Sequence, residues 1–482
     1  MNLEIKNFLK NKNILVMGLG KSGISVIKKL TSLPVSVFGM DNNPYIDIES
    51  NLAEIEKTKG FKLEIRLDEK INEDVDIIKG IDLAVVSPGI PNDIGVIKEA
   101  DKRGIPIWSE IEFAWKLMPE EAKKKTIGVT GTNGKTTVVT LIEKILVEAG
   151  KKAVVCGNIG NPLINTIDWR YSEDTIRVIE ISSFQLERIY SFKPHAAVVL
   201  NISNDHMDRH YTMDNYADTK FKIFSNLDGF DWGIFNIDDI FISKKLQEKN
   251  CYSKSNLNII KYSFKKSQQW TSDNFIYYKD NNIHYKIKGD AGKIDISEMN
   301  LVGEHNILNI MACLGSAKIF NVDDASIEKT VKNFKTLRHR IEFIEIINNI
   351  RCFNDSKATN PDATVKALSS FKKEVTLILG GKDKEMDFSV LLPYLNDTVL
   401  NLILIGETRN KILNLVKKQI EINYKVYLCD CLEEAVNKGF EVTKPGNVFL
   451  LSPACASFDM FRDYKDRGEK FKNLILKRKN NG

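Results

Sequence analysis

A chain of 482 residues, of which 43% are hydrophobic and 28% charged, has the composition of a folded protein of roughly three domains. Its net charge of +5 gives no support for nucleic-acid binding, which requires a strongly basic, clustered face, and no apolar run is long enough to cross a membrane. The N-terminus lacks a signal-peptide core and the seven cysteines are scattered, so we expect a cytoplasmic protein without disulfides or membrane insertion.

Short β-branched runs alternate with amphipathic helical runs along the chain, which predicts α/β domains with largely parallel sheets. The strands predicted from these runs are 14–17, 35–39, 83–86, 153–156, 176–181, 196–201, 232–236, 375–379, 402–405, 425–428 and 448–451.

The first predicted strand is followed by Gly18-Leu-Gly-Lys-Ser-Gly23, and Asp41 stands at the end of the second. Together they match a dinucleotide-binding fingerprint, in which glycines let the backbone approach a diphosphate and the acid reaches a ribose. The turn Ser87-Pro-Gly89 ends the third strand and would form a second wall of the same site. We interpret this region as a nucleotide diphosphate site. The alternative is a tight turn that binds nothing, and these residues do not separate NAD from other nucleotides.

The most specific motif is Val129-Thr-Gly-Thr-Asn-Gly-Lys-Thr-Thr137, between an apolar run and an amphipathic helix predicted over 137–149. Backbone N–H groups and the helix N-terminus can cradle the phosphates of a nucleotide triphosphate, Lys135 can neutralise them and Thr136 can hold Mg²⁺. A usual phosphate-binding loop has glycine where this chain has Val129.

Polar side chains follow the next predicted strands. Glu180 ends an apolar strand, where an acid that orders Mg²⁺ belongs. The loop 157–162 suits a polar ligand, although such loops more often bind nothing. His206, within the polar stretch 201–210, is a candidate ligand of a metal other than zinc, and the alternative is a solvated loop. Lys220, on a predicted helix, would by itself be a surface lysine.

Residues 240–298 are rich in Lys, Asn, Ser and Tyr, with alternating patches at 275–278 and 283–287. We predict antiparallel strands and variable loops there, without a functional motif. A helix is predicted over 305–320, and its first turns carry Asn306 and Asn309 on one side.

Three polar loops in the last third of the chain are predicted to follow strands: 354–360, 379–384 and 451–459, the last leading to Arg467. Because the carboxyl ends of parallel strands share one edge of a sheet, we expect a cationic, hydroxyl-lined pocket that fits a small dicarboxylate. A set of solvated loops is the alternative. Arg340, at the start of this region, suits the binding of phosphate or carboxylate.

At this point the chain resembles the Mur ligases, from the Gly18 turn to Arg467-Gly468. The loop Thr130-Gly-Thr-Asn-Gly-Lys135 is common to Mur ligases and folylpolyglutamate synthases, and the continuation Thr136-Thr137 is similar to the Mur branch. Within that branch, the stretches 205–208, 355–360 and 451–457 resemble the member that adds D-glutamate.

The resemblance implies an α/β protein of three domains. Residues 1–109 would form a Rossmann-like domain that binds the uridine diphosphate. Residues 110–336 would form a central P-loop ATPase-like domain with a mainly parallel sheet, and residues 337–482 a Rossmann-like domain that binds the amino acid.

The resemblance also implies the residues of each site. The uridine diphosphate sugar would be bound by Gly20, Lys21, Ser22, Asp41, Gly89, Asn158 and His206. ATP would be bound by Gly131, Thr132, Asn133, Gly134, Lys135, Thr136, Thr137, Asn306, Asn309, Arg340 and Asp355. D-glutamate would be bound by Lys357, Thr359, Lys384, Ser457 and Phe458. Two Mg²⁺ ions would be held by Thr136, Glu180, His206 and a carbamylated Lys220, and the expected catalytic residues are Lys135, His206 and Lys220.

The implied activity is ATP-dependent amide formation through an acyl phosphate, which adds D-glutamate to UDP-N-acetylmuramoyl-L-alanine. This is a cytoplasmic step of peptidoglycan synthesis that serves cell-wall growth, cell shape and division, and we expect a monomer. One alternative is another Mur ligase or a folylpolyglutamate synthase-like ligase, against which the loop 355–360 argues. A non-catalytic nucleotide-binding regulator would not need the metal ligands, and an NAD oxidoreductase would leave the P-loop unexplained.

Overall fold

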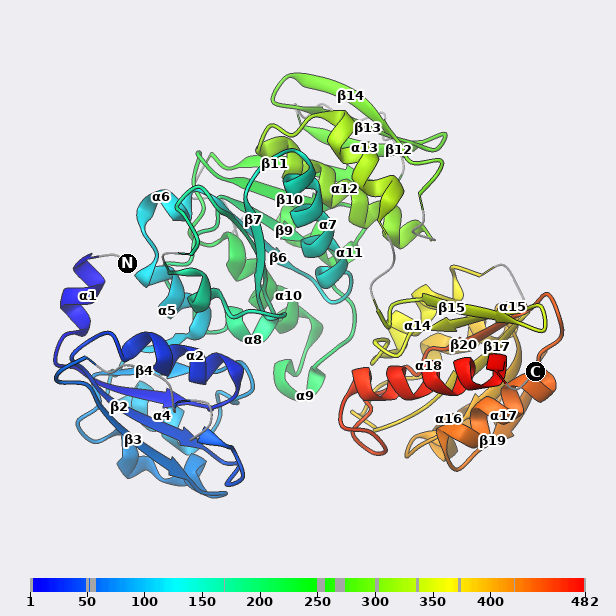
Figure 1. Ribbon diagram of the computed structural model, residues 1–482, viewed down its shortest axis with the longest axis horizontal. Coiled ribbons are helices and arrows are strands. Elements are labelled where there is room, and N and C mark those ends of the chain that lie inside the picture. The colour runs from blue at the N-terminus through cyan, green and yellow to red at the C-terminus, as the bar shows by residue number, and fades with distance from the viewer. Residues whose placement is uncertain are drawn as a thin grey trace. The chain divides into compact units, whose positions relative to one another are not determined.

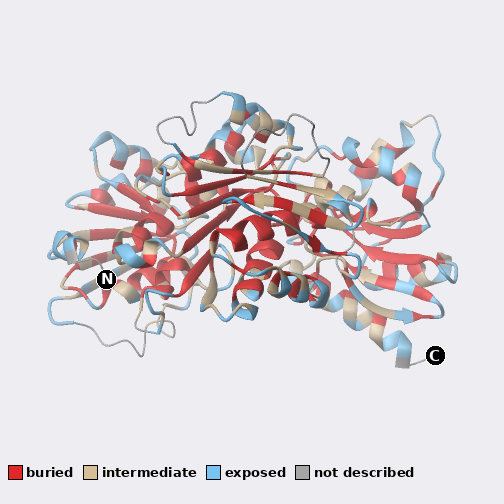
Figure 2. Ribbon diagram, turned by 90° about the horizontal axis from the view of Figure 1, so that it is seen from above, coloured by how far each residue is buried: buried red, intermediate tan, exposed pale blue. Residues whose placement is uncertain are grey.

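The computed structural model describes residues 3–48, 52, 58–168, 170–248, 256–264, 274–299, 303–334, 338–371, 374–419 and 421–480. The chain forms two compact units, the first drawn from 1–202, 209–297 and 308–331, the second from 203–208, 298–307 and 332–482 (Figure 1). Strands form largely buried layers, and exposed residues gather on helices and loops (Figure 2). The predicted α/β class is confirmed by three sheets whose strands pair mainly in parallel.

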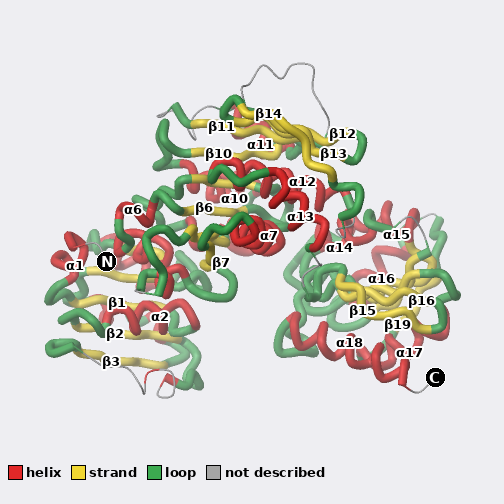
Figure 3. Tube along the Cα trace, turned by 45° about the horizontal axis from the view of Figure 1, so that its top comes forward, coloured by secondary structure: helices red, strands yellow, loops and turns green. Residues whose placement is uncertain are grey.

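The N-terminal sheet has five parallel strands in the order β3-β2-β1-β4-β5, and Figure 3 shows β1, β2 and β3 side by side. Its strands are β1 (Asn13–Met17), β2 (Ser36–Asp41), β3 (Lys62–Leu67), β4 (Leu83–Val86) and β5 (Ile107–Ser109). The helices of this region are α1 (Leu3–Leu9), α2 (Lys21–Leu30), α4 (Gly95–Lys102) and α5 (Glu110–Leu117), with 3-10 turns η1 (Ile71–Glu73) and η2 (Val75–Ile78). Since β1 pairs with both β2 and β4, the loops after these strands meet at one edge.

The central sheet has nine strands in the order β14-β13-β12-β11-β10-β9-β6-β8-β7. They are β6 (Thr126–Thr130), β7 (Ala153–Gly157), β8 (Ile176–Glu180), β9 (Ala196–Val199), β10 (Trp232–Asn236), β11 (Asn258–Ser263), β12 (Phe275–Lys279), β13 (Asn282–Ile287) and β14 (Asp290–Asp295). The helices are α6 (Glu120–Lys123), α7 (Lys135–Glu148), α8 (Ser183–Leu186), α9 (Met207–His210), α10 (Met213–Phe221), α11 (Ile240–Gln247), α12 (Glu304–Ile319) and α13 (Asp324–Asn333), with 3-10 turns η3 (Leu163–Thr166) and η4 (Lys222–Phe224).

The stretch 240–298 differs in part from its prediction. It begins with helix α11 rather than a strand, and β11 pairs in parallel with β10 and β12. Only β12, β13 and β14 form the expected antiparallel pairs. The stretch therefore extends the central sheet by four strands, β11 to β14.

Both edge strands of the central sheet have a backbone N–H covered by a glutamate from a helix. Val155 of β7 donates to Glu143 of α7 at 3.1 Å, and Asp295 of β14 donates to Glu328 of α13 at 3.0 Å. Each glutamate gives an edge N–H group an acceptor within the same molecule.

Helix α5 carries two buried glutamates that contact loops of the central region. The Glu112 carboxylate accepts hydrogen bonds from the three N–H groups of residues 190–192 at 2.9 to 3.1 Å. Glu110 accepts one from Ile164 N at 3.1 Å, and burial raises the pKa of its carboxyl to about 7. Two acids on one helix therefore fix two separate loops of the same unit.

The third sheet has six strands in the order β15-β16-β20-β17-β18-β19, parallel except for the β15–β16 pair. Its strands are β15 (Glu342–Ile347), β16 (Ile350–Asn354), β17 (Val375–Leu379), β18 (Val399–Leu404), β19 (Lys425–Leu428) and β20 (Val448–Leu451). The helices are α14 (Pro361–Leu368), α15 (Leu392–Thr398), α16 (Arg409–Lys417), α17 (Leu432–Val442) and α18 (Tyr464–Asn480), with the 3-10 turn η5 (Ser389–Leu391).

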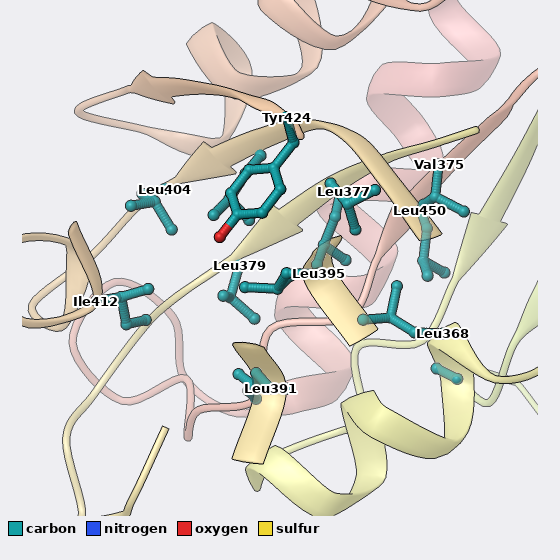
Figure 4. Packing of buried hydrophobic residues seen from close by; sticks show 14 of the residues in the cluster. Leu368, Val375, Leu377, Leu379, Leu391, Leu395, Leu404, Ile412, Tyr424 and Leu450 are labelled. Atoms are coloured by element: carbon teal, nitrogen blue, oxygen red, sulfur yellow. The ribbon is translucent and has the colours of Figure 1, made fainter. Parts of the chain in front are cut away.

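Alternation along the strands of the third sheet divides its core into two layers. Leu377 and Leu379 of β17 pack with Leu404 and Leu450 on one face, as Figure 4 shows. Ile378, between them in sequence, packs into the cluster on the other face. Because successive strand residues point to opposite sides, the apolar run of β17 supplies both layers.

Across the described ranges, no helix combines the length and the apolar character that a membrane span requires.

Candidate active site

The glycine-rich turn after β1 is held by close backbone contacts. Gly18 has φ 84°, and Ser87 Oγ, after β4, donates a hydrogen bond to the Gly18 carbonyl at 2.7 Å. A Cβ on Gly23 would lie 2.0 Å from the Gly18 oxygen, so only glycine fits there. As predicted, this turn and the Ser87-Pro-Gly89 turn lie at the same edge of the sheet.

Some side chains near this turn hydrogen-bond to backbone groups, and other positions leave space beside it. The Asp41 carboxylate accepts hydrogen bonds from Leu19 N at 2.6 Å and Asn43 N at 2.9 Å, so it fixes the turn itself. The Lys21 ammonium donates to the Gly160 carbonyl, in the loop after β7. Gly20 has open space where a Cβ would stand, and the adjacent Ser22 is half-buried in the first turn of α2.

The P-loop runs from the end of β6 to the start of α7, which begins two residues before its prediction. Gly131 has φ 147° and Gly134 φ 88°, so the backbone curls through conformations that favour glycine. Asn201, after β9, fixes the curl: its carbonyl accepts from Thr132 N at 2.9 Å, and its side chain exchanges two bonds with the Asn133 backbone at 2.8 and 3.0 Å.

Lys135 and Asn309 both contact this loop. The Lys135 ammonium donates to the carbonyls of Gly131 at 2.7 Å and Thr132 at 2.8 Å. A Cβ on Gly134 would stand 2.6 Å from Asn309 Oδ1, so α12 packs closely on the loop. The cation therefore lies over the hollow of the P-loop, where phosphates of a nucleotide bind.

Thr136, Glu180 and Asn158 form a chain of contacts beside the loop. Thr136 Oγ1 donates to Glu180 Oε2 at 2.8 Å, and Asn158 Nδ2 donates to Glu180 Oε1 at 3.1 Å. Glu180 lies at the end of β8, as predicted, and its side chain is buried. A hydroxyl and a carboxylate are oxygen donors of the kind that Mg²⁺ prefers, so these residues fit that ion.

Lys220 is a buried residue, in contrast to the surface position that its sequence context by itself predicts. Its side chain is 1% exposed, and the ammonium donates to the Gly131 carbonyl at 3.0 Å. It lies 4.4 Å from the Tyr216 ring centroid, and the Thr132 hydroxyl is 3.3 Å from the Tyr216 hydroxyl. Helix α10 thus brings Lys220 to the P-loop.

The residues predicted to hold metal ions do not form a cluster of acids and histidines in the described part of the chain. Within the ranges that the structure describes, no group of three or more His, Cys, Asp or Glu side chains is arranged to hold a metal ion. Mg²⁺ normally keeps several waters and takes only one or two carboxylates, so the Thr136–Glu180 pair is compatible with it.

In the second unit, the segment 203–208 is joined to the start of α14. Asn360 Nδ2 donates to Asp205 Oδ2 at 3.1 Å, and Ser203 Oγ donates to Asp362 Oδ2 at 2.8 Å. His206 Nε2 lies 3.6 Å from Asp205 Oδ2, and the residue has φ 57°. Asn306, Arg340 and Asp355 also belong to this unit, and the roles assigned to them and to His206 stay predictions.

The three polar loops of the third sheet meet at one edge, as predicted. The buried Arg467 guanidinium joins two of them: it donates to the Ser356 carbonyl at 2.8 Å and to the Cys455 carbonyl at 3.0 Å. The third loop is attached by Lys382 N, which donates to the Ala456 carbonyl at 2.9 Å. Burial lowers the pKa of Arg467 to about 10, which leaves it charged at neutral pH.

The five residues predicted to bind D-glutamate all come from these loops, but they differ in exposure. Ser457 is buried, Thr359 and Lys357 are half-buried, and Lys384 and Phe458 are exposed. The Lys357 ammonium lies 5.5 Å from the Tyr464 ring centroid. The loops therefore carry the buried hydroxyl of Ser457, and the ammonium groups of Lys357 and Lys384 lie on less buried residues.

Asp355 is a buried acid at the end of β16. Ser452 Oγ donates to Asp355 Oδ2 at 2.7 Å and Ile341 N donates to Oδ1 at 3.1 Å, while burial raises the pKa of this carboxyl to about 7. Arg340 stands between His339 and Ile341, which have φ values of 65° and 44°. Two left-handed residues therefore set the direction of the chain at Arg340.

Two residues important for these loops were not assigned a role from the sequence. Asn201 closes the P-loop, and Arg467 joins the loops of the third sheet. The signal for Asn201 in the sequence is its place at the end of the predicted strand 196–201, and the structure adds that β9 pairs with the P-loop strand β6. Arg467 was noted only as part of the motif after the last polar loop, and its contact with Ser356, 111 residues away along the chain, has no local signal.

Three domain families match the chain in succession. Residues 12–109 match the Mur ligase MurD-like N-terminal domain, residues 129–317 the Mur ligase middle domain, and residues 339–455 the Mur ligase glutamate ligase domain.

The chain is also similar to whole proteins. It is 39% identical over 468 residues to the UDP-N-acetylmuramoylalanine–D-glutamate ligase of Thermoanaerobacter sp. (strain X514), which covers 97% of this chain and 98% of that protein. The ligase of the same name from Clostridioides difficile (strain 630) is 37% identical over 467 residues, with 97% and 99% covered. The crystal structure of UDP-N-acetylmuramate-alanine ligase MurC from Thermotoga maritima has a TM-score of 0.57 at 18% identity, covering 97% of this chain and 99% of that one. This last likeness concerns the fold.

Proposed function

The chain belongs to the Mur ligase family, and from this premise we propose that it adds D-glutamate to UDP-N-acetylmuramoyl-L-alanine. It is an ATP-dependent ligase of peptidoglycan synthesis that uses ATP and Mg²⁺. The observation that carries the proposal is the surroundings of the P-loop. Lys135 and the buried Lys220 both donate to the Gly131 carbonyl, and the Thr136–Glu180 pair lies beside them.

The proposed reaction has two steps. The L-alanyl carboxylate attacks the γ-phosphate of ATP in line, which forms an acyl phosphate and releases ADP. The amine of D-glutamate then attacks the acyl carbon, loses a proton, and displaces phosphate to leave an amide. Lys135 neutralises the negative charge of the transferring phosphoryl group, and bound Mg²⁺ would polarise its oxygens.

The assignment of substrates to residues is part of this proposal. The uridine diphosphate sugar is assigned to Gly20, Lys21, Ser22, Asp41, Gly89, Asn158 and His206. ATP is assigned to residues 131–137 with Asn306, Asn309, Arg340 and Asp355. D-glutamate is assigned to Lys357, Thr359, Lys384, Ser457 and Phe458. The corresponding domains are 1–109, 110–336 and 337–482. We also propose that the protein is cytoplasmic and monomeric, and sedimentation would test the oligomeric state.

Carbamylation of Lys220 and binding of two Mg²⁺ ions also belong to the proposal. Addition of CO₂ to the amine would convert a cation into an oxygen-donor anion, which Mg²⁺ prefers. The burial of Lys220 against the P-loop supports this, since the carbamate would lie beside Thr136 and Glu180 in the same unit.

A direct assay tests the reaction. The purified protein is mixed with UDP-N-acetylmuramoyl-L-alanine, ATP, Mg²⁺ and one amino acid at a time, and phosphate release and product mass are measured. We expect turnover with D-glutamate and much less with L-glutamate or L-alanine. Absence of phosphate release with D-glutamate would overturn the proposal.

A second assay tests the carbamate. Lys220→Ala should lose activity and regain part of it with added short carboxylates, which replace the carbamate oxygens. Lys222→Ala is the matched control, because that ammonium donates to the Glu187 carbonyl at 3.1 Å, whereas the Lys220 ammonium donates to the P-loop. Unchanged activity of Lys220→Ala would exclude the carbamate.

A further inference from the structure

The loop after β4, residues 87–92, is held from two directions. From within the N-terminal region, Ser87 Oγ donates to the Gly18 carbonyl at 2.7 Å. From the central region, Arg209 Nη1 donates to the Pro88 carbonyl at 3.0 Å. The position of Pro88 therefore depends on a side chain that lies 121 residues further along the chain.

Arg209 is itself fixed in place. Its Nε donates to Glu187 Oε1 at 3.0 Å and its Nη2 donates to the other carboxylate oxygen, so the guanidinium is held as a fork. The guanidinium also lies 4.2 Å from the ring centroid of Phe184, and both charged side chains are largely buried. Asn92, at the end of the same loop, donates to Glu187 as well.

The Pro88 carbonyl and the Gly89 N–H belong to one planar trans peptide, so they point in opposite directions. A group that holds the carbonyl consequently sets the direction of the N–H. Gly89 is exposed, and an added Cβ would meet no atom within 4 Å, so there is room for a ligand beside this peptide.

We propose that Arg209 is a positioning residue for nucleotide recognition, which holds the Pro88 carbonyl so that the Gly89 N–H points toward the uridine diphosphate. The inference rests on the proposed function in one respect, the assignment of Gly89 to the uridine diphosphate site. Arg209 does not itself touch the nucleotide.

Arg188 provides a matched control. It connects the same two regions, donating to Asn92 Oδ1 at 3.0 Å and to both Asp101 oxygens at 2.8 Å. Among the described hydrogen bonds of Arg188, none goes to Pro88, so Arg188 connects the two regions without orienting the Pro88–Gly89 peptide. Methionine at either position keeps an unbranched apolar side chain and removes the donors.

The experiment compares Arg209→Met with Arg188→Met in the full-length protein. Dissociation constants for UDP and for ATP are measured by calorimetry, together with the KM for each substrate. Arg209→Met should weaken UDP binding and raise the KM for the UDP-sugar about tenfold, the loss of one charge-assisted hydrogen bond. ATP binding and the KM for D-glutamate should not change. Arg188→Met should change the dissociation constant for UDP less than twofold.

Equal weakening of UDP binding by both variants, or equal weakening of UDP and ATP by Arg209→Met, would overturn the inference. If Arg209→Met does not fold, Glu187→Gln replaces it, because it weakens the contact that holds the guanidinium. We then expect a smaller rise in the dissociation constant for UDP and no change in that for ATP. Because UDP binding is measured without turnover, a wild-type protein that binds UDP but ignores D-glutamate would refute the proposed reaction and leave this test intact. A wild-type protein that does not bind UDP would refute both.

Discussion

The glycine-rich turns after β1 and β6 each lead into a helix, and their lysines behave differently. Lys135 folds back over its own loop and donates to the Gly131 and Thr132 carbonyls. Lys21 extends away from its turn to the Gly160 carbonyl of another loop. One cation therefore lies over its own loop, and the other connects its turn to the loop after β7.

The residues that complete the two turns also differ in chemistry. Acidic Asp41 binds the backbone of the first turn, whereas neutral Asn201 binds that of the second. Beside the second turn, the Thr136–Glu180 pair supplies oxygen donors for a metal ion. Similar local sequences thus give a turn suited to holding a diphosphate and a turn suited to phosphoryl transfer, and the difference comes from neighbouring strands.

The largest expected effect separates the two lysines. Lys135→Met should lower kcat about 10³-fold or more, because a charge that stabilises the transferring phosphoryl group is removed. Lys21→Met should instead raise the KM for the UDP-sugar about tenfold at most, with kcat nearly unchanged, since it loses a single charge-assisted contact. Steady-state kinetics with each substrate varied in turn measure both. A comparable fall in kcat for the two variants would contradict the distinction.

An intermediate effect concerns the packing of the first turn. Gly23→Ala should lower the free energy of unfolding by about 1–3 kcal/mol, because its Cβ would lie 2.0 Å from the Gly18 oxygen. Gly20→Ala is the control, since open space surrounds that position. Urea denaturation followed by circular dichroism gives both values, and equal stability of the two variants would show that the turn relaxes freely.

The smallest expected effect is a pH dependence of stability, which arises at the segment that follows the loop contacted by Lys21. Glu110 binds Ile164 N in the segment after Gly160, and its carboxyl has a pKa of about 7 in the folded chain against an ordinary 4.5. The folded state therefore holds an extra proton between these values, so this group's contribution to stability falls as pH rises from about 4.5 to 7.

Glu110→Gln keeps an acceptor for Ile164 and cannot ionise. Its unfolding free energy relative to wild type should improve by up to about 2.5 kcal/mol between pH 5 and pH 8. Denaturation at the two pH values measures the change. A constant difference between variant and wild type would show that Glu110 does not titrate in this range.

The sequence was most informative where function depends on neighbours along the chain. The Gly18–Gly23 turn, the P-loop and Glu180 were predicted because each follows directly from the end of an apolar strand. The grouping of the three polar loops of the third sheet also followed, since strands that pair in parallel end at the same edge.

Contacts between distant parts of the chain were not predictable in this way. Arg209 with Pro88 and Arg467 with Ser356 join residues that no local pattern relates. The burial of Lys220 is similar, because its depth depends on how α10 packs on the P-loop.

The strands that the sequence did not reveal are mostly polar or short. Edge strand β3 alternates charged and apolar residues and is half-exposed, and edge strand β14 has only one buried position. Strand β5 has three residues. Such strands lack the continuous apolar run that marks a strand buried on both faces, so propensity alone does not separate them from loops.

The glutamates at the two ends of the central sheet have a consequence for behaviour in a crowded solution. An edge strand with unpaired N–H groups is a template on which a strand of another molecule can add. Glu143 and Glu328 occupy such groups on β7 and β14, and each places a carboxylate at the line along which a new strand would join. Each carboxylate therefore opposes the addition of a further strand at that point of the edge.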